Sequence, residues 1–354
     1  MDKSAGVGLN LIRKIVDENC SADQQLLTHA NWKVVMDFCL SQGVAGICFE
    51  AFEMLEKTCR PPKFLLMEWY GKVKLHEYFY KQHKEALEHL AQFYSREGVR
   101  MLLLKGYGLS LFWPTPEHRP VGDIDCYNFG QQKHADKRIS EEYGITIDNS
   151  HHKHSVFKFE DTMVENHYSF LNVHGHRSTA EIERILEGEV KEGCTEDREL
   201  KNVWYPSVRF NSLYLLRHSA EHFASVDINL RQVLDWGFFV RANKMDWDWL
   251  LCQLEQMGMK RYLAVLNAIC VRHLGFDASL FPVLEIDERL VERCLNDILS
   301  PEFQKKRHRN ALAEIAYRFK RWNANRWKHD MVYKESIWQS FCTQAWSHVL
   351  KPSL

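Results

Sequence analysis

The spacing of apolar residues divides the chain into three stretches. From residue 8 to 95 they recur every three or four positions, which predicts helices, with one long amphipathic helix or two in line over 63–95. Short apolar runs separated by turns follow, and the helical spacing then returns. The pattern predicts an α+β fold, in which a small mixed β-sheet is flanked by N-terminal and C-terminal helical regions. The expected boundaries are 1–97, 98–206 and 207–354.

The middle stretch contains the expected strands. A buried strand in "VRMLLLKG" is followed by a brief helix in "YGLSLFW", and "GDIDCYNF" is a second strand. "GITID" is a short strand, "HSVFKFEDTMVENHYSF" is a pair of strands around a tight turn at Glu160 and Asp161, and "NVWYP" is an edge strand. Helices are expected at 131–143 and, exposed and acidic, at 179–191.

The last stretch reads as a helical bundle with no repeat and no long linker. Its apolar spacing predicts seven helices, at 208–225, 228–242, 246–256, 259–273, 284–298, 303–322 and 335–349.

Composition limits the class of protein. Of 354 residues, 45% are apolar and 26% charged, as in ordinary globular proteins. With 46 basic and 47 acidic residues, the balanced charge gives no overall attraction to nucleic acid or to an anionic membrane. The ten cysteines include no C-x-x-C pair, and no apolar run approaches the roughly 20 residues of a membrane span. We therefore expect a cytoplasmic protein with reduced cysteines and no membrane segment.

The candidate chemistry begins with Asp123 and Asp125. Carboxylates two residues apart on a strand point to the same face, and their repulsion calls for a cation between them. Carboxylate oxygens suit Mg²⁺, or Mn²⁺ in its place. Glu165, on a strand that could pair beside the aspartate strand, is the best third ligand, and His167 shares its face. A cluster of this kind can bind metal and promote displacement at phosphorus.

A second group of residues upstream suits phosphate. Gly106, after a buried strand, lets a phosphate approach the backbone closely. Lys105 adds a point charge, and Arg119 has the planar guanidinium that matches phosphate oxygens.

Together these residues resemble a known enzyme family. Lys105-Gly106, Arg119, "DID" and an acidic residue near a histidine on a later strand resemble the polymerase-beta-like nucleotidyltransferase superfamily, and more narrowly a bacterial group of uncharacterised nucleotidyltransferases. The later segment "HSAEHFASVDINLRQVLDW" is similar to a helical segment of that group, where the matching residues are His222, Arg231 and Asp235.

The resemblance implies a metal-dependent enzyme that moves a nucleoside monophosphate from a nucleoside triphosphate, such as ATP, to a hydroxyl acceptor. The acceptor could be a small molecule, a protein or a tRNA. The implied catalytic and metal-binding residues are Asp123, Asp125 and Glu165. The implied nucleotide-binding residues are Lys105, Gly106, Arg119, His167, His222, Arg231 and Asp235.

Two features depart from the family pattern, and one of them is the gap from Gly106 to Asp123, which is a few residues longer than usual. The superfamily commonly has Gly-Ser or Gly-Gly after the first strand, whereas this chain has Gly106-Tyr107, so that Ser110 or Lys105 would have to replace the missing hydroxyl. Arg231 and Asp235, spaced i, i+4 on a helix, could also simply pair with one another.

Three other interpretations stay open. A catalytically degenerate nucleotide-binding or regulatory module is favoured by the missing Gly-Ser and opposed by the three carboxylates. "HSAEH" at 218–222 is the reversed zincin motif of a zinc peptidase, with Glu288 or Glu292 as a third ligand. The stretch 305–328, with nine basic residues and interleaved aromatics, could bind RNA; the plainer interpretation is a helix whose aromatics pack inward while its charges face water.

Overall fold

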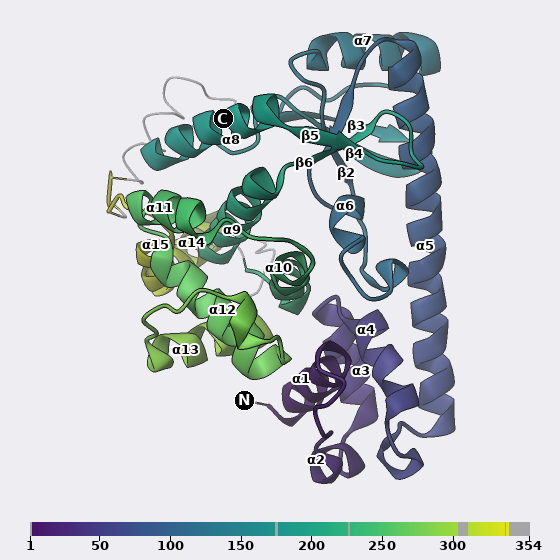
Figure 1. The fold of residues 1–354 in the computed structure, drawn as a ribbon, viewed down its shortest axis with the longest axis vertical. Coiled ribbons are helices and arrows are strands. Elements are labelled where there is room, and N and C mark those ends of the chain that lie inside the picture. Colours follow the sequence, from purple (N-terminus) through teal and green to yellow (C-terminus); the bar gives the residue numbers. More distant parts are fainter. Residues whose placement is uncertain (1, 174–175, 226, 304–310, 337, 340–354) are drawn as a thin grey trace.

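A six-stranded mixed sheet organises the middle of the molecule (Figure 1). The computed structural model describes residues 2–173, 176–225, 227–303, 311–336 and 338–339. The strand order is β3-β4-β2-β1-β6-β5, with β2–β4 and β1–β6 parallel and the other pairs antiparallel. The strands are β1 Met101–Leu103, β2 Ile124–Tyr127, β3 His154–Phe159, β4 Thr162–His167, β5 Cys194–Glu196 and β6 Val203–Pro206. The predicted α+β class with a mixed sheet is confirmed.

The β3–β4 hairpin turns where its sequence predicts. Glu160 and Asp161 both have positive φ, of 44° and 63°, as a tight two-residue turn requires. Two other strand predictions were wrong. "GITID" forms only an isolated bridge from Asp148 to Val156, and "NVWYP" becomes an inner strand, because the short polar strand β5 pairs outside it.

One face of the sheet packs on two helices. The long helix α5 (Lys63–Arg96) runs along one side of the molecule, and α7 (Gln132–Tyr143) lies over the end of the sheet (Figure 1). The second half of α5 joins α7 and the buried residues Ile124, Cys126 and Val164 in one apolar cluster. The alternate residues of β2 and β4 therefore point to the opposite face.

The N-terminal region is helical, as predicted, and packs on the first half of α5. The α5 residues Leu65, Trp69 and Val73 belong to the same apolar cluster as the N-terminal helices. Those helices are α1 Lys3–Val16, α2 Gln24–Thr28, α3 Trp32–Ser41 and α4 Ala45–Glu50, followed by the 3-10 turns η1 Ala51–Met54 and η2 Lys57–Cys59.

Between the strands, short helices and α8 complete the core. α6 (Tyr107–Ser110) and the 3-10 turn η3 (Pro116–His118) connect β1 to β2. α8 (Arg177–Glu192) was expected to be exposed, but Ile182 and Leu186 are fully buried against the following helix. The buried carboxylate of Glu183 also accepts hydrogen bonds from the backbone N–H groups of Phe170 and Leu171, at 2.8 and 2.9 Å.

The C-terminal helices follow the predicted order closely. They are α9 Val208–Ser225, α10 Leu230–Ala242, α11 Trp247–Gln256, α12 Lys260–Leu274, η4 Ala278–Leu280, α13 Glu288–Leu299, α14 Ala311–Ala324 and α15 Arg326–Val332. The helix expected at 335–349 lies mostly outside the described residues, as do residues 304–310 of the one expected at 303–322. Within the described helices, none has both the length and the apolarity needed to cross a membrane.

The described part of the basic stretch differs from the plainer interpretation at two residues. Lys328 is 1% exposed and forms ion pairs with Asp297 at 2.5 Å and Asp227 at 3.4 Å. Phe319, in contrast, is 65% exposed. The charge of Lys328 therefore stabilises the packing of α15, and binding of RNA by 305–328 stays a prediction.

Candidate active site

Strand pairing brings the acidic residues and Lys105 together. Because β1 and β2 are antiparallel, the end of β1 lies beside the start of β2, and Lys105 comes next to Asp125. Because β2 and β4 are parallel and in register, Asp125 lies opposite Glu165. Asp123 directly precedes β2. The predicted proximity of the carboxylates thus follows from the sheet topology.

The three carboxylates form a compact cluster. One oxygen each from Asp123, Asp125 and Glu165 lies within 4.8 Å of the others. Asp125 is the central residue: its Oδ1 is 2.9 Å from Nζ of Lys105 and 3.1 Å from Nε2 of His167. Its Oδ2 is buried and has no hydrogen-bond partner among the described residues.

The charges around Asp125 keep it ionised. Burial alone would raise its pKa, but the Lys105 ammonium and the hydrogen bond from His167 hold the pKa well below its usual range. Burial and the charge of Asp125 raise the pKa of Asp123. For Glu165 burial acts upward, yet the hydrogen bond from His167 brings the pKa below the ordinary value.

This cluster fits a divalent cation. All three groups offer hard oxygen ligands, which Mg²⁺ and Mn²⁺ prefer. The unpartnered, buried Oδ2 of Asp125 is a polar atom whose desolvation is uncompensated within the protein, and a cation would compensate it.

A cavity of about 440 Å³ opens beside the carboxylates, between the sheet and the helices α9 and α10. The predicted nucleotide-binding residues line it, apart from His167, which lies beneath Asp125. The lining comprises Lys105, Gly106, Leu109, Arg119, Gly122, Asp123, Asp125, Leu215, His218, Ser219, His222, Asp227, Asn229, Arg231, Gln232, Asp235 and Trp236.

Asp235 binds Arg119 and not Arg231. The Nε and Nη2 atoms of Arg119 donate to the two carboxylate oxygens of Asp235 at 2.7 and 2.9 Å, and Trp113 donates to the same carboxylate at 2.9 Å. Arg231 instead donates to the carbonyl oxygen of Pro120 at 3.2 Å. The alternative that Arg231 and Asp235 simply pair with one another is therefore not what forms, and Asp235 holds Arg119 in place.

Gly106 has the backbone conformation that the site demands. Its φ is +64°, a region that glycine adopts readily, and a Cβ there would meet the carbonyl oxygen of Asp123 at 3.4 Å. Ser110 does not supply the missing hydroxyl. It is fully buried, donates to the carbonyl of Tyr107 at 2.6 Å and contacts the hydroxyl of Tyr80 at 2.9 Å.

The motif "HSAEH" does not form a zinc site among the described residues. His218 and His222 line the cavity with their rings 4.5 Å apart, but neither belongs to a group of side chains placed to hold a metal. Glu221 is bound to Arg217 at 3.0 Å. Glu288 pairs with Arg272, and Glu292 lies 3.7 Å from His273, so among the described residues neither predicted third ligand joins the two histidines in a metal site.

Two residues at the site were missed from the sequence. His154 lies opposite His167 in the β3–β4 pair, and its Nδ1 is 3.5 Å from Glu165. Lys153 has its pKa lowered by burial and by the neighbouring Lys105 charge. The tract "HHKH" contains both, and the strand register could have revealed them: counting back from the turn at Glu160 pairs His154 with His167.

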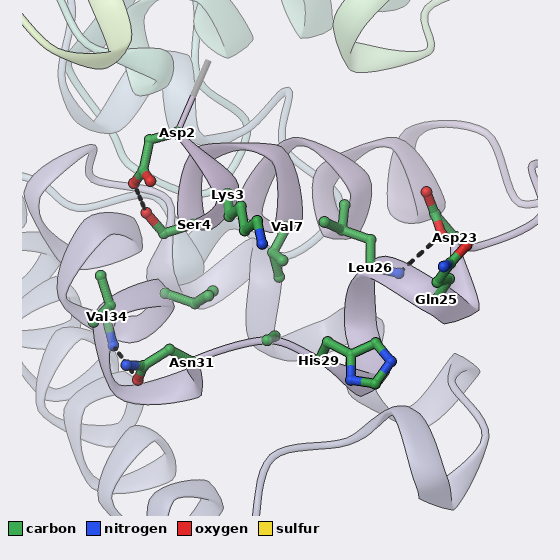
Figure 2. A pocket seen from close by; sticks show the side chains of 12 residues that line it. Asp2, Lys3, Ser4, Val7, Asp23, Gln25, Leu26, His29, Asn31 and Val34 are labelled. Atoms are coloured by element: carbon green, nitrogen blue, oxygen red, sulfur yellow. Dashed lines mark hydrogen bonds between the residues drawn. The ribbon is translucent and has the colours of Figure 1, made fainter.

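A second cavity of about 440 Å³ lies at the N-terminal helices (Figure 2). Two of its polar side chains cap helices. Asp23 accepts from the N–H of Leu26 at 3.0 Å, and Asn31 accepts from the N–H of Val34 at 3.4 Å. Since Asp23 and Asn31 are already bonded and Ser4 donates to Asp2, the described residues of this cavity form no group comparable to the carboxylate cluster.

Comparison with known proteins agrees with this geometry. Residues 28–275 match a family model described as uncharacterised nucleotidyltransferase. No curated protein and no solved structure matches the chain. The matched region contains the sheet, α9 and α10, and therefore every residue of the carboxylate cluster and of the cavity beside it.

Proposed function

The chain belongs to the family of uncharacterised nucleotidyltransferases, and from that premise we propose that it transfers a nucleoside monophosphate from a nucleoside triphosphate to a hydroxyl acceptor. The observation that carries the proposal is the convergence of Asp123, Asp125 and Glu165 beside a cavity that presents Lys105 and Arg119. The parallel pairing of the "DID" strand with the strand of Glu165 supports placement in the polymerase-beta-like superfamily.

In this proposal the carboxylate cluster holds Mg²⁺ or Mn²⁺. The bound ion would stabilise charge on the phosphate oxygens and lower the pKa of the attacking hydroxyl. The protein contributes the arrangement of the ligands, because Lys105 and His167 fix one oxygen of Asp125 and leave the other without a partner.

Basic residues of the cavity would bind the triphosphate. Lys105 and Arg119 lie on its wall, and Arg119 is held rigidly by Asp235. Arg231 is a further donor that lines the cavity, and its buried Nε has no hydrogen-bond partner among the described residues. Two guanidinium groups and one ammonium can neutralise much of the phosphate charge and orient the chain of phosphates for attack.

The transfer itself is a displacement at the α-phosphorus. The acceptor oxygen forms a bond to that phosphorus, the bond to the bridging oxygen of the β-phosphate breaks, and pyrophosphate leaves with the electron pair. The proton of the acceptor passes to a carboxylate. The two candidates are Asp125 and Glu165, and Asp125 is the weaker base of the two because Lys105 and His167 hold its pKa well below the usual range.

The test is transfer of label from α-labelled nucleoside triphosphates, with Mg²⁺ or Mn²⁺, to metabolite, protein and tRNA fractions of a cell lysate. Asp123→Asn and Asp125→Asn should each lower transfer by roughly 10²–10³-fold or more. Asp161→Asn, the same substitution at an exposed residue of the β3–β4 turn, is the matched control. Transfer that survives in both site variants, with circular dichroism unchanged, would refute the proposal.

A degenerate nucleotide-binding module is the second candidate. Two features favour it, since both reduce the contacts left for phosphate. The chain has Gly106-Tyr107 after the first strand, and Lys105 is ion-paired with Asp125. Calorimetry and pyrophosphate release separate the two. An enzyme releases pyrophosphate in the presence of its acceptor, whereas a module of this kind binds nucleoside triphosphate and releases none with any fraction.

A further inference from the structure

Two imidazoles adjoin the carboxylate cluster on its β3 side. Because β3 and β4 are antiparallel, His154 is the register partner of His167, and their ring centroids are 5.2 Å apart. Glu165, two residues before His167 on β4, points to the same face of the sheet. The three side chains therefore surround one small volume.

The distances within this group match those of a metal site. His154 Nδ1 and His167 Nε2 each lie 3.5 Å from Oε2 of Glu165. The three donor atoms are all within 4.8 Å of one another. Donors held at about 2.0–2.2 Å from a tetrahedral ion are about 3.3–3.6 Å apart. Little movement of the side chains would therefore be needed to bind an ion.

The orientation of both rings also fits. The Nδ1 of His167 faces the carbonyl oxygen of Ser169 at 3.1 Å, which fixes the hydrogen on Nδ1 and directs Nε2 toward Asp125 and Glu165. A carbonyl behind a ligating histidine is the usual arrangement in metal sites. The Nδ1 of His154 is buried and makes no hydrogen bond among the described residues, although it faces Glu165.

The simpler interpretation is a charged His167 that only bridges Asp125 and Glu165. That interpretation accounts for the contacts of 3.1 and 3.5 Å from Nε2. It leaves the buried Nδ1 of His154 without a hydrogen bond, which is unfavourable for a polar atom removed from water. An ion between the two imidazoles and Glu165 accounts for both rings: it would take the place of the Nε2 hydrogen of His167 and leave Lys105 as the partner of Oδ1 of Asp125.

We propose that His154, Glu165 and His167 form a second metal site, the imidazole site, which takes a divalent transition-metal ion of the zinc type. Two imidazoles and one carboxylate are a set that Zn²⁺ and Co²⁺ accept and that Mg²⁺ disfavours. Glu165 then belongs to both sites. The importance of the imidazole site for nucleotide transfer rests on the proposed function, whereas its metal binding does not.

Co²⁺ titrated into the protein in excess Mg²⁺ tests the proposal. Mg²⁺ occupies the carboxylate cluster, so the visible absorption of Co²⁺ reports the imidazole site and distinguishes nitrogen and oxygen ligands from thiolates. Wild type should bind one equivalent, and His154→Ala should weaken that binding at least ~10-fold. His134→Ala, at an exposed histidine of α7, is the matched control and should bind as wild type does.

Asp123→Asn separates this proposal from the proposed function. That variant should lose transfer activity yet still bind Co²⁺, because Asp123 contributes no ligand to the imidazole site. The proposal is overturned if wild type binds no Co²⁺ in excess Mg²⁺, if the absorption indicates thiolate ligation, or if His154→Ala binds Co²⁺ as tightly as wild type.

Discussion

At the residue scale, the shape of the cavity depends on one buried ion pair. Arg119 and Asp235 have side chains only 5% and 7% exposed and are joined by two hydrogen bonds. Bidentate geometry of this kind holds a guanidinium in one orientation. The remaining N–H groups of Arg119 are thereby held in a fixed direction. A residue that binds phosphate from the wall of a cavity requires such a fixed direction.

Asp235→Ala should therefore destabilise the protein by about 3–5 kcal/mol, because it leaves the buried Arg119 charge uncompensated. Urea unfolding followed by circular dichroism measures this. The control is Glu255→Ala, which removes an exposed pair with Lys260 at 2.7 Å and should cost no more than about 1 kcal/mol. Equal losses in the two variants would show that water entering the cavity already screens Arg119.

At the element scale, the contact between α4 and the η3 turn positions the segment that carries Arg119. Gly46 of α4 lies against His118, and a Cβ at that glycine would come within 2.8 Å of the Cα and carbonyl oxygen of His118. His118 is itself held by Glu50 at 2.5 Å and by Glu77 at 3.2 Å. The backbone of α4 at Gly46 and the backbone of η3 at His118 therefore cannot move apart independently.

Gly46→Ala should accordingly destabilise the fold by about 1–3 kcal/mol, even though alanine favours a helix. Gly71→Ala is a matched control. That glycine also lies inside a helix, α5, but a Cβ there would meet nothing within 4 Å, so the substitution should stabilise by up to about 1 kcal/mol. Thermal unfolding of both variants compares them, and a stabilising effect of Gly46→Ala would contradict the assigned contact.

The helices and the carboxylate cluster could be predicted because each depends on local pattern. Apolar spacing fixed α9 to α12 within two residues of their observed ends, since burial of one helix face governs where each helix runs. The placing of Glu165 beside Asp125 needed only the expectation that the two strands are neighbours; that they pair in parallel is shown by the structure.

The sequence alone does not show which residues pair when several possible partners lie far apart in the chain. Asp235 had two cationic partners available, and packing of α10 against the β1–β2 connection selected Arg119 over Arg231. β5 was missed because its three residues, Cys194–Glu196, are too few to show an alternation of apolar and polar positions. His154 was missed because its position beside His167 depends on strand register.

At the scale of the whole molecule, α5 joins regions that are far apart in the sequence. Its first half packs with α1 to α4 and its second half beneath the sheet (Figure 1). The cluster around the N-terminal helices also includes residues of α9 to α13, and α1 contacts α12 directly. Events that destabilise one region should therefore lower the stability of the others.

Buried neutral histidines in different regions make the molecule sensitive to acid. Burial lowers the pKa of His83 in α5 to about 4, that of His154 in β3 to about 4 and that of His176, at the start of α8, to about 3. In the unfolded chain each would titrate near pH 6.5. Between these values the unfolded state binds more protons than the folded state, so protonation favours unfolding.

These histidines should therefore lower the free energy of unfolding as the pH drops from 6.5 toward 4, by up to about 1.4 kcal/mol per pH unit for each group. Glu183 acts in the opposite direction between pH 7 and 4.5, because burial raises its pKa to about 7. For His83, which is 3% exposed, the difference between 6.5 and about 4 corresponds to about 3 kcal/mol. Between pH 7.5 and pH 5, where most of this difference is already expressed, His83→Leu should flatten the dependence by about 2 kcal/mol, whatever its effect at neutral pH. His134→Leu, at an exposed histidine, should leave the slope unchanged. Urea unfolding at pH 7.5, 6 and 5 measures the three slopes, and a slope for His83→Leu as steep as that of wild type would show that His83 protonates in the folded state without cost.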